Sequence, residues 1–160
     1  MARIQKKKGL DYIFHLADYI KVNNLNKIII DFYGQIDSCD NEYFQENIQK
    51  YDFISYKGSL LPAKIHSTLS LYDILLLPTH YYTEGFPGSV LDAYYAGIPV
   101  IVTNWKYANE FVVNEKSGFI IPFENGEKEL INTIIKLENH PTLLVEMKNE
   151  AKKKGIEYSP

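Results

Sequence analysis

The sequence is poor in cysteine, has no long hydrophobic run and carries no excess of basic charge. Cys39 is the only cysteine, so an intramolecular disulfide is impossible and a reducing cytoplasm is the simplest location. The longest apolar runs, at 74–77 and 98–102, are far shorter than the roughly 20 residues that span a bilayer. The lysine-rich start does not lead into the apolar stretch of a signal peptide. The formal net charge of −3 offers no general attraction for nucleic acid or an anionic membrane.

Several common catalytic motifs are also missing. The sequence has no Asp-x-Asp pair, no serine nucleophile elbow and no Gly-x-x-x-x-Gly-Lys loop. Its four histidines lack metal-ligand spacing, and His80, in a loop near Glu84, is interpreted as a surface residue. The acidic cluster Asp37, Asp40 and Glu42 lies in a polar loop, where a turn and a helix cap are expected. We therefore predict no metal site and no cofactor.

What is present indicates a globular protein. Hydrophobic residues make up 46% of the 160 residues, and glycine and proline are few, at nine and seven. A chain of this length can bury one sizeable core. Residues 1–160 are therefore expected to form a single domain.

Helical and strand patterns alternate along the chain. Apolar residues recur at helical spacing over 10–20, and residues 27–33 are rich in β-branched and aromatic types that end at Gly34. Continued to the end, the patterns predict helices over about 10–20, 41–51, 62–71, 88–95, 109–113, 126–138 and 141–154, and strands over 27–33, 53–57, 74–77, 100–103 and 119–121. Apolar strands separated by helices predict an α/β fold: a doubly wound, Rossmann-like parallel sheet with helices on both faces.

The start of the chain is unusual for this fold class. Doubly wound domains usually begin with a strand, yet only residues 1–4 precede the first predicted helix. We expect the domain to lack its first strand. Ligands in such sheets bind at the carboxyl ends of the strands, which directs attention to the loops after Gly34, Gly58, Pro78 and Thr103.

The stretch 83–101 has the most informative spacing. A helix is predicted to start at Gly88, between Glu84 in the preceding loop and Asp92 one turn into the helix. The free N–H groups of a helix N-terminus favour phosphate, and carboxylates on either side can accept hydrogen bonds from ribose or sugar hydroxyls. From spacing alone, the simpler interpretation is favoured, in which Glu84 is a loop charge and Asp92 is a first-turn acid that complements the helix dipole.

This stretch resembles the signature of the group 1 glycosyl transferases, a retaining GT-B family, in which two acids separated by seven intervening residues precede a small-residue helix and a Gly-x-Pro-Val strand. The start of the chain resembles the family segment whose two cations hold the donor diphosphate, because Arg3 is followed after four residues by Lys8 and Gly9. Without that resemblance, Lys6–Lys8 would be interpreted as a solvated run of charges. The family's second acid is usually Glu, so Asp92 shortens the reach to the ribose by one methylene.

The resemblance implies roles for individual residues. Glu84, Arg3 and Lys8 would be catalytic, with Glu84 orienting the sugar and the cations stabilising the leaving diphosphate. Pro87 has no N–H, so phosphate donors would be the N–H groups of Gly88, Ser89 and Val90. The remaining donor-binding positions would be Asp92, Phe86, Gly34 and, in the loop that receives the base, Leu60 and Lys64.

The implied function is the donor-binding half of a metal-independent hexosyltransferase. It would move a sugar from a UDP- or GDP-linked donor to an acceptor sugar or lipid-linked saccharide, in bacterial polysaccharide or lipopolysaccharide synthesis. The acceptor would be bound by an N-terminal domain that this chain is expected to lack. The parent is expected in the cytoplasm, with peripheral membrane association left open, and the isolated chain is expected to be incomplete as an enzyme. A non-catalytic nucleotide- or sugar-phosphate-binding module is the alternative. A receiver-like signalling domain is a poorer match, because residues 34–37 offer no acidic cluster after a strand.

Overall fold

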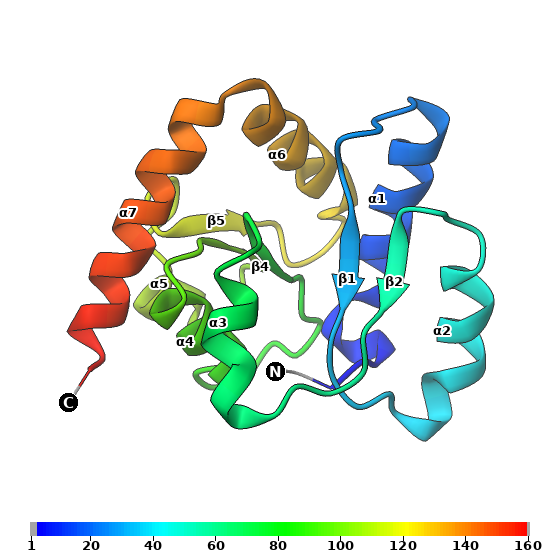
Figure 1. Cartoon of the computed structure of the whole chain (residues 1–160), viewed down its shortest axis with the longest axis horizontal. Coiled ribbons are helices and arrows are strands. Elements are labelled where there is room, and N and C mark those ends of the chain that lie inside the picture. Colours follow the sequence, from blue (N-terminus) through cyan, green and yellow to red (C-terminus); the bar gives the residue numbers. More distant parts are fainter. Residues whose placement is uncertain (1–2, 160) are drawn as a thin grey trace.

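The computed structural model describes residues 3–159 as two parallel β-sheets surrounded by helices (Figure 1). Met1 and Ala2, counted above among the residues ahead of the first helix, lie outside the described part. The α-helices are α1 Leu10–Val22, α2 Asn41–Ile48, α3 Ile65–Leu69, α4 Gly88–Tyr95, α5 Ala108–Phe111, α6 Glu127–Asn139 and α7 Pro141–Glu157. The strands are β1 Ile30–Phe32, β2 Ile54–Tyr56, β3 Leu75–Leu77, β4 Val100–Thr103 and β5 Gly118–Ile121, and 3-10 turns form η1 Lys6–Lys8, η2 Ser38–Asp40 and η3 Pro62–Lys64.

All strand pairs are parallel, as the alternation of helices and strands predicts. β1 pairs with β2 in the register Ile30 to Ile54, and β3, β4 and β5 form a second sheet in that order. In residues 3–159 the parallel strands are divided between two sheets, since β1 and β3 do not pair with each other. A cavity lies between these two strands.

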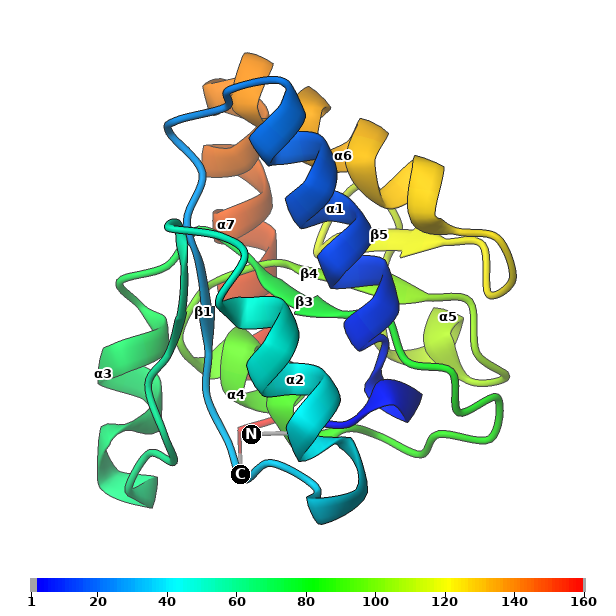
Figure 2. The ribbon, with the colours of Figure 1, turned by 90° about the vertical axis from the view of Figure 1, so that its right-hand side faces the viewer.

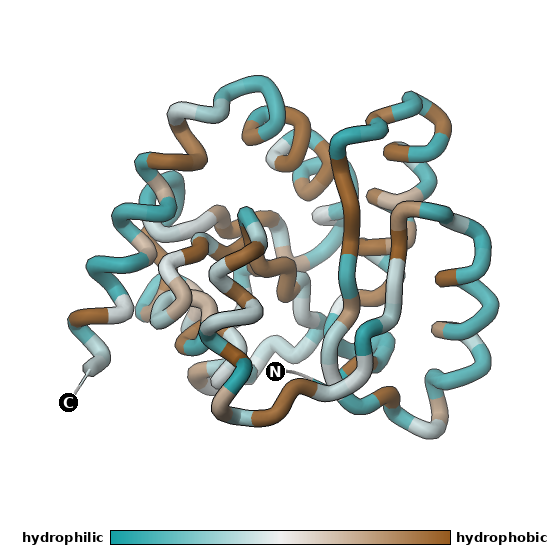
Figure 3. Tube along the Cα trace, in the orientation of Figure 1, coloured by the Kyte–Doolittle hydropathy of each residue, from teal (hydrophilic) through white to brown (hydrophobic). Residues whose placement is uncertain are grey.

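Helices cover both faces of the strands, each with its own apolar cluster. α1, α2 and α6 pack in the cluster that contains Leu16, Phe44 and Leu130 (Figures 1 and 2). α3, α4, α5 and α7 pack in the cluster built around Val90 and Trp105. Hydrophobic residues follow the strands and the inner helical faces, whereas the outer turns of α2 and α7 are largely hydrophilic (Figure 3). This two-faced cover is the doubly wound arrangement. Within residues 3–159, no helix combines the length and the apolar character needed to cross a bilayer.

The segment before α1 connects the ends of the two sheets. Ile4 forms a parallel bridge with Ile36, just beyond β1. Further along, the backbone N–H of His80, just beyond β3, donates to the carbonyl oxygen of Lys7 at 2.8 Å. Gly9 then has a left-handed backbone, with φ +88°, and packs directly on Pro78. Residues 4–9 therefore cross from the carboxyl end of β1 to the carboxyl end of β3.

Replacing Gly9 with alanine should destabilise the fold. A Cβ at this position would stand 2.1 Å from the carbonyl oxygen of Pro78, and its backbone conformation already disfavours a side chain. We expect the free energy of unfolding to fall by about 2 kcal/mol or more, measured by urea denaturation. Gly85→Ala is the matched control, because a Cβ there meets nothing within 4 Å. Equal stability of the two variants would contradict the close packing of Gly9 on Pro78.

Candidate functional site

The carboxylate of Glu84 is held by a cation and a hydroxyl. Lys8 Nζ donates to Glu84 Oε2 at 2.5 Å, and Thr79 Oγ1 donates to the same oxygen at 3.0 Å. The side chains of Lys8 and Glu84 are only 17% and 16% exposed, so their ion pair is more strongly shielded from solvent than a typical surface pair. The fold thus brings together two residues that are 76 positions apart in the sequence.

Thr79 is the residue of this group that the sequence analysis missed. It is fully buried at the end of β3, and its carbonyl oxygen accepts a hydrogen bond from Thr103 Oγ1 at 2.5 Å, at the end of β4. Its own hydroxyl accepts from the backbone N–H of Tyr81 at 3.1 Å while it donates to Glu84. Thr79 therefore fixes the Glu84 carboxylate to the carboxyl ends of two strands. The available signal was a polar residue two positions after an apolar strand.

The N-terminus of α4 begins at Gly88, as predicted. The backbone at Gly88 borders open space, since a Cβ there would meet nothing within 4 Å. The Ser89 side chain is buried, and its Oγ has no hydrogen-bond partner among the described residues. Val90 differs from the prediction, because its N–H already donates to the carbonyl oxygen of Pro87 at 3.0 Å. Gly88 and Ser89 are therefore the backbone donors of this turn that can face a ligand.

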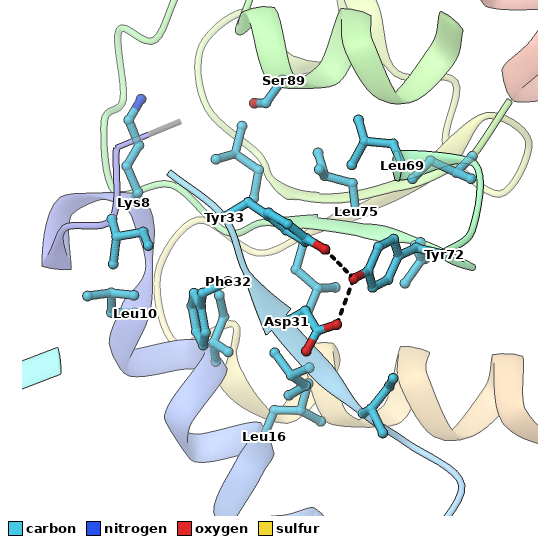
Figure 4. A pocket seen from close by; sticks show the side chains of 18 of the residues that line it. Lys8, Leu10, Leu16, Asp31, Phe32, Tyr33, Leu69, Tyr72, Leu75 and Ser89 are labelled. Atoms are coloured by element: carbon cyan, nitrogen blue, oxygen red, sulfur yellow. Dashed lines mark hydrogen bonds between the residues drawn. The ribbon is translucent and has the colours of Figure 1, made fainter. Parts of the chain in front are cut away.

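A cavity of about 200 Å³ joins the predicted cations to this helix terminus. We call it the central cavity; its walls are residues 28–33 around β1 and 74–77 around β3, and Arg3, Lys8 and Ser89 lie on its lining. In Figure 4, Lys8 and Ser89 lie above β1 and Leu16 of α1 lies below it. The two cations and the α4 N-terminus thus line the same cavity and supply its positive groups.

A hydrogen-bonded trio lines another part of the central cavity. The hydroxyl of Tyr72 donates to Asp31 Oδ2 at 2.6 Å and lies 2.7 Å from the hydroxyl of Tyr33 (Figure 4). Burial, reinforced by the hydrogen bond to the Asp31 carboxylate, raises the pKa of Tyr72 above its ordinary value. Tyr72 therefore keeps its proton at neutral pH and links the segment before β3 to β1.

Asp92 has a neighbour that the sequence analysis did not single out. His66 on α3 places Nε2 3.1 Å from Asp92 Oδ1 on α4, and its ring also meets the ring of Tyr95 edge-on. The contact arises because α3 and α4 pack against each other. No spacing rule joins positions 66 and 92, so only the fold reveals this pair.

The other predicted donor-binding residues lie outside the lining of the central cavity. Gly34 follows β1 with φ +132°, and its N–H donates to the carbonyl oxygen of Gly58. Leu60 and Lys64 lie in the loop after β2 and in η3, where Lys64 is exposed. The Phe86 ring stacks on the ring of Phe111, with centroids 4.3 Å apart.

His80, interpreted from the sequence as a surface residue, is partly exposed but has specific partners. Its Nε2 lies 2.7 Å from Asp11 Oδ1, and its ring packs edge-on against Tyr12 of α1. It anchors the loop of Glu84 to α1. The acidic cluster behaves as expected: Asp37 accepts from the N–H of Cys39 in a turn, and Asp40 accepts from the N–H of Lys6. Across residues 3–159, His, Cys, Asp and Glu form no group of three or more that could hold a metal ion.

Comparisons with known proteins identify related sequences. The family model for group 1 glycosyl transferases matches residues 1–154. The UDP-Gal:alpha-D-GlcNAc-diphosphoundecaprenol alpha-1,3-galactosyltransferase of Escherichia coli is 33% identical over 154 residues, covering 93% of this chain and 38% of that protein. The capsular polysaccharide biosynthesis glycosyltransferase CapM of Staphylococcus aureus is 28% identical over 146 residues, covering 89% of this chain and 37% of that protein. The chain therefore spans well under half the length of these relatives.

A solved structure shows the same fold. The C-terminal domain of a glycosyl transferase group 1 family protein, LpcC from Francisella tularensis, matches with a TM-score of 0.83 at 19% identity. The match covers 99% of this chain and 83% of that one. The predicted fold class, a Rossmann-like half of a GT-B fold, is confirmed.

Proposed function

The chain belongs to the group 1 glycosyl transferases, and on that basis we propose that it binds the nucleotide sugar donor of a retaining transferase. The donor would be a nucleoside diphosphate sugar. The acceptor, a sugar or a lipid-linked saccharide, would bind a second domain of a longer parent protein. The setting would be the synthesis of bacterial surface polysaccharide in the cytoplasm, with the parent free or attached to the membrane periphery.

One observation carries the proposal: Arg3, Lys8 and the N-terminus of α4 border the same cavity. A diphosphate placed there would meet two side-chain cations and the N–H groups of Gly88 and Ser89. Such a combination of charge and helix dipole is a suitable anion site. The buried Ser89 hydroxyl, which has no partner among the described residues, adds a further donor at the same point.

The same groups account for a metal-independent reaction. Breaking the bond between sugar and diphosphate leaves extra negative charge on the diphosphate, and fixed positive groups stabilise that charge without reorganisation. Arg3, Lys8 and the α4 N-terminus would act in this way. Glu84, already positioned by Thr79, would orient the sugar hydroxyls, and Asp92 would accept hydrogen bonds from the ribose.

UDP is the first nucleotide to test. The related Escherichia coli enzyme is named for a UDP-galactose donor. Calorimetric titration of the chain with UDP, GDP and the free nucleosides tests the proposal directly. Micromolar to millimolar binding of a nucleoside diphosphate, and much weaker binding of the nucleoside, is expected; no binding of any nucleotide would overturn it.

Ser89→Ala should weaken UDP binding without weakening the fold. Its hydroxyl is buried and lacks a described partner, so removing it relieves an unsatisfied polar group instead of breaking a bond. Loss of one hydrogen bond to a charged phosphate should raise the Kd for UDP by roughly tenfold. Calorimetry gives the Kd, and thermal denaturation should give an unchanged or higher Tm.

Ser117→Ala provides the matched control. The Ser117 hydroxyl is also buried, but it accepts from the N–H of Val113 at 3.0 Å and bonds the hydroxyl of Tyr94 at 3.1 Å. This variant should lose about 1–3 kcal/mol of stability and keep its UDP affinity. If Ser89→Ala behaves like Ser117→Ala in both measurements, Ser89 does not contact the diphosphate.

A further inference from the structure

A contact from α3 reaches Asp92, the α4 residue proposed to bind the ribose. His66 Nε2 lies 3.1 Å from Asp92 Oδ1, where α3 and α4 pack against each other (Figure 1). An ionised carboxylate only accepts hydrogen bonds, so Nε2 carries the proton and donates. The imidazole of His66 therefore supplies the Asp92 carboxylate with a hydrogen-bond donor from a neighbouring helix.

The His66 ring is held in place by a second contact on α4. It meets the ring of Tyr95 edge-on, with the ring centroids 5.4 Å apart. Tyr95 lies three residues after Asp92, so the two side chains lie on the same face of the helix. The Tyr95 hydroxyl in turn donates to the carbonyl oxygen of Tyr158 at 2.9 Å, just beyond the end of α7. One face of α4 thus fixes both the position of the imidazole and the direction of its Nε2.

The contact acts on the orientation of the carboxylate more than on the stability of the fold. The side chains of His66 and Asp92 are 51% and 22% exposed, so water competes for both partners and the pair contributes little to folding. The last side-chain torsion of aspartate is only loosely restricted by its own chemistry. A donor on a fixed ring therefore helps to set the plane of the Asp92 carboxylate.

The pair of His66 and Asp92 lies between the two ends of the proposed donor site. Asp92 follows Ser89 by three residues on α4, which places both side chains on one face of that helix. His66 follows Lys64 by two residues, just after the segment proposed to receive the base. In a nucleotide, the ribose lies between the base and the diphosphate. A nucleotide that runs from the segment of Lys64 to the N–H of Ser89 therefore brings its ribose to Asp92 and His66.

We propose that His66 is a positioning residue, which directs the Asp92 carboxylate at the ribose hydroxyls and thereby selects ribonucleotides over nucleotides that lack these hydroxyls. The inference rests on the proposed donor site and names the part of the donor that α3 helps to recognise. An ionised carboxylate can accept about four hydrogen bonds, so the bond from His66 is compatible with two more from a vicinal diol. A carboxylate held in one plane accepts both hydroxyls without first having to be ordered.

The test compares UDP with 2′,3′-dideoxy-UDP, which lacks both ribose hydroxyls. By calorimetry, the Kd for the dideoxy compound should exceed the Kd for UDP by at least about tenfold in the unmodified chain. In His66→Ala this ratio should fall by at least about threefold, because the carboxylate is no longer directed at the hydroxyls. His66→Gln should keep most of the ratio, since its amide can donate from nearly the position of Nε2. The Tm of both variants should stay within about 4 °C of the unmodified value.

Two comparisons separate positioning from other effects. His140→Ala removes an exposed histidine whose ring contacts the carbonyl oxygen of Lys136, and it should leave the ratio unchanged. In the Asp92→Ala background, His66→Ala should lower the ratio no further, because a positioning residue acts only through its partner.

Three outcomes would contradict this account. A further fall in the Asp92→Ala background would mean that His66 contacts the ribose itself, and this would overturn the positioning role. An unchanged ratio in His66→Ala, with UDP still bound by the unmodified chain, would mean that the contact only joins two helices, and it would overturn this inference alone. No binding of UDP by the unmodified chain would overturn the donor site and this inference together.

Discussion

Glu84→Ala should abolish sugar transfer by a protein that combines this chain with the proposed acceptor-binding domain. The Glu84 carboxylate is held by Thr79 and by Lys8, a residue that lines the central cavity, and it would orient the sugar for transfer. In the proposed role, its removal would lose contacts that matter most as the sugar separates from the diphosphate. We expect kcat to fall by about 100- to 1,000-fold or more, measured as sugar transferred from radiolabelled donor.

Two further variants show whether the fall in kcat is specific to the Glu84 carboxylate. Glu84→Gln keeps the size of the side chain and one acceptor oxygen, so it should retain more activity than Glu84→Ala. Glu146→Ala removes an exposed acid from α7 and should transfer sugar at the normal rate. Each variant should unfold at nearly the temperature of the unmodified protein. Wild-type turnover by Glu84→Ala would remove Glu84 from the mechanism.

Replacing both Arg3 and Lys8 with alanine should weaken UDP binding far more than uridine binding. Both side chains border the central cavity beside Ser89, where they would meet the diphosphate and not the nucleoside. A hydrogen bond to a charged group contributes about 1.5–3 kcal/mol, so two should change the Kd for UDP by about 100-fold or more. The Kd for uridine, measured in the same calorimeter, should change by less than about threefold.

The matched control removes the same charge from neighbouring positions. Lys6 and Lys7 are exposed, and their ammonium groups lie over the rings of Tyr43 and Tyr81 instead of lining the cavity. The double variant Lys6→Ala and Lys7→Ala should therefore leave the Kd for UDP within about threefold at moderate salt, since exposed charges are screened. Equal loss in the two double variants would point to net charge as the cause and not to position.

Local patterns predicted the elements that have strong periodicity or clear end signals. β4 has the predicted bounds, and α4 begins and ends where glycine and the small-residue pattern indicated. Several strands are shorter than expected; β1, predicted over 27–33, spans only Ile30–Phe32. Its ends lack a ladder partner on one side, so hydrophobic composition alone extended it too far. Composition reports which residues prefer a strand, but pairing decides which residues form one.

Long-range contacts account for what the sequence could not reveal. The separation of β1 from β3 reflects how the two sheets pack, which no pattern within either strand encodes. The contact of His66 with Asp92 and the support of Glu84 by Thr79 likewise join residues brought together by helix and strand packing. The Val90 N–H was assigned to a ligand because it lies in the first helical turn, but the fold uses it to close that turn on Pro87.

The backbone resonances of Gly88 and Ser89 during titration with UDP provide the most direct test of the donor site. If the α4 N-terminus and the amino-terminal cations bind a diphosphate, the chemical shifts of both amides should change in a saturable manner with UDP and should hardly change with uridine. Shifts of the same size with uridine, or saturation by UDP that leaves both signals unmoved, would contradict the account.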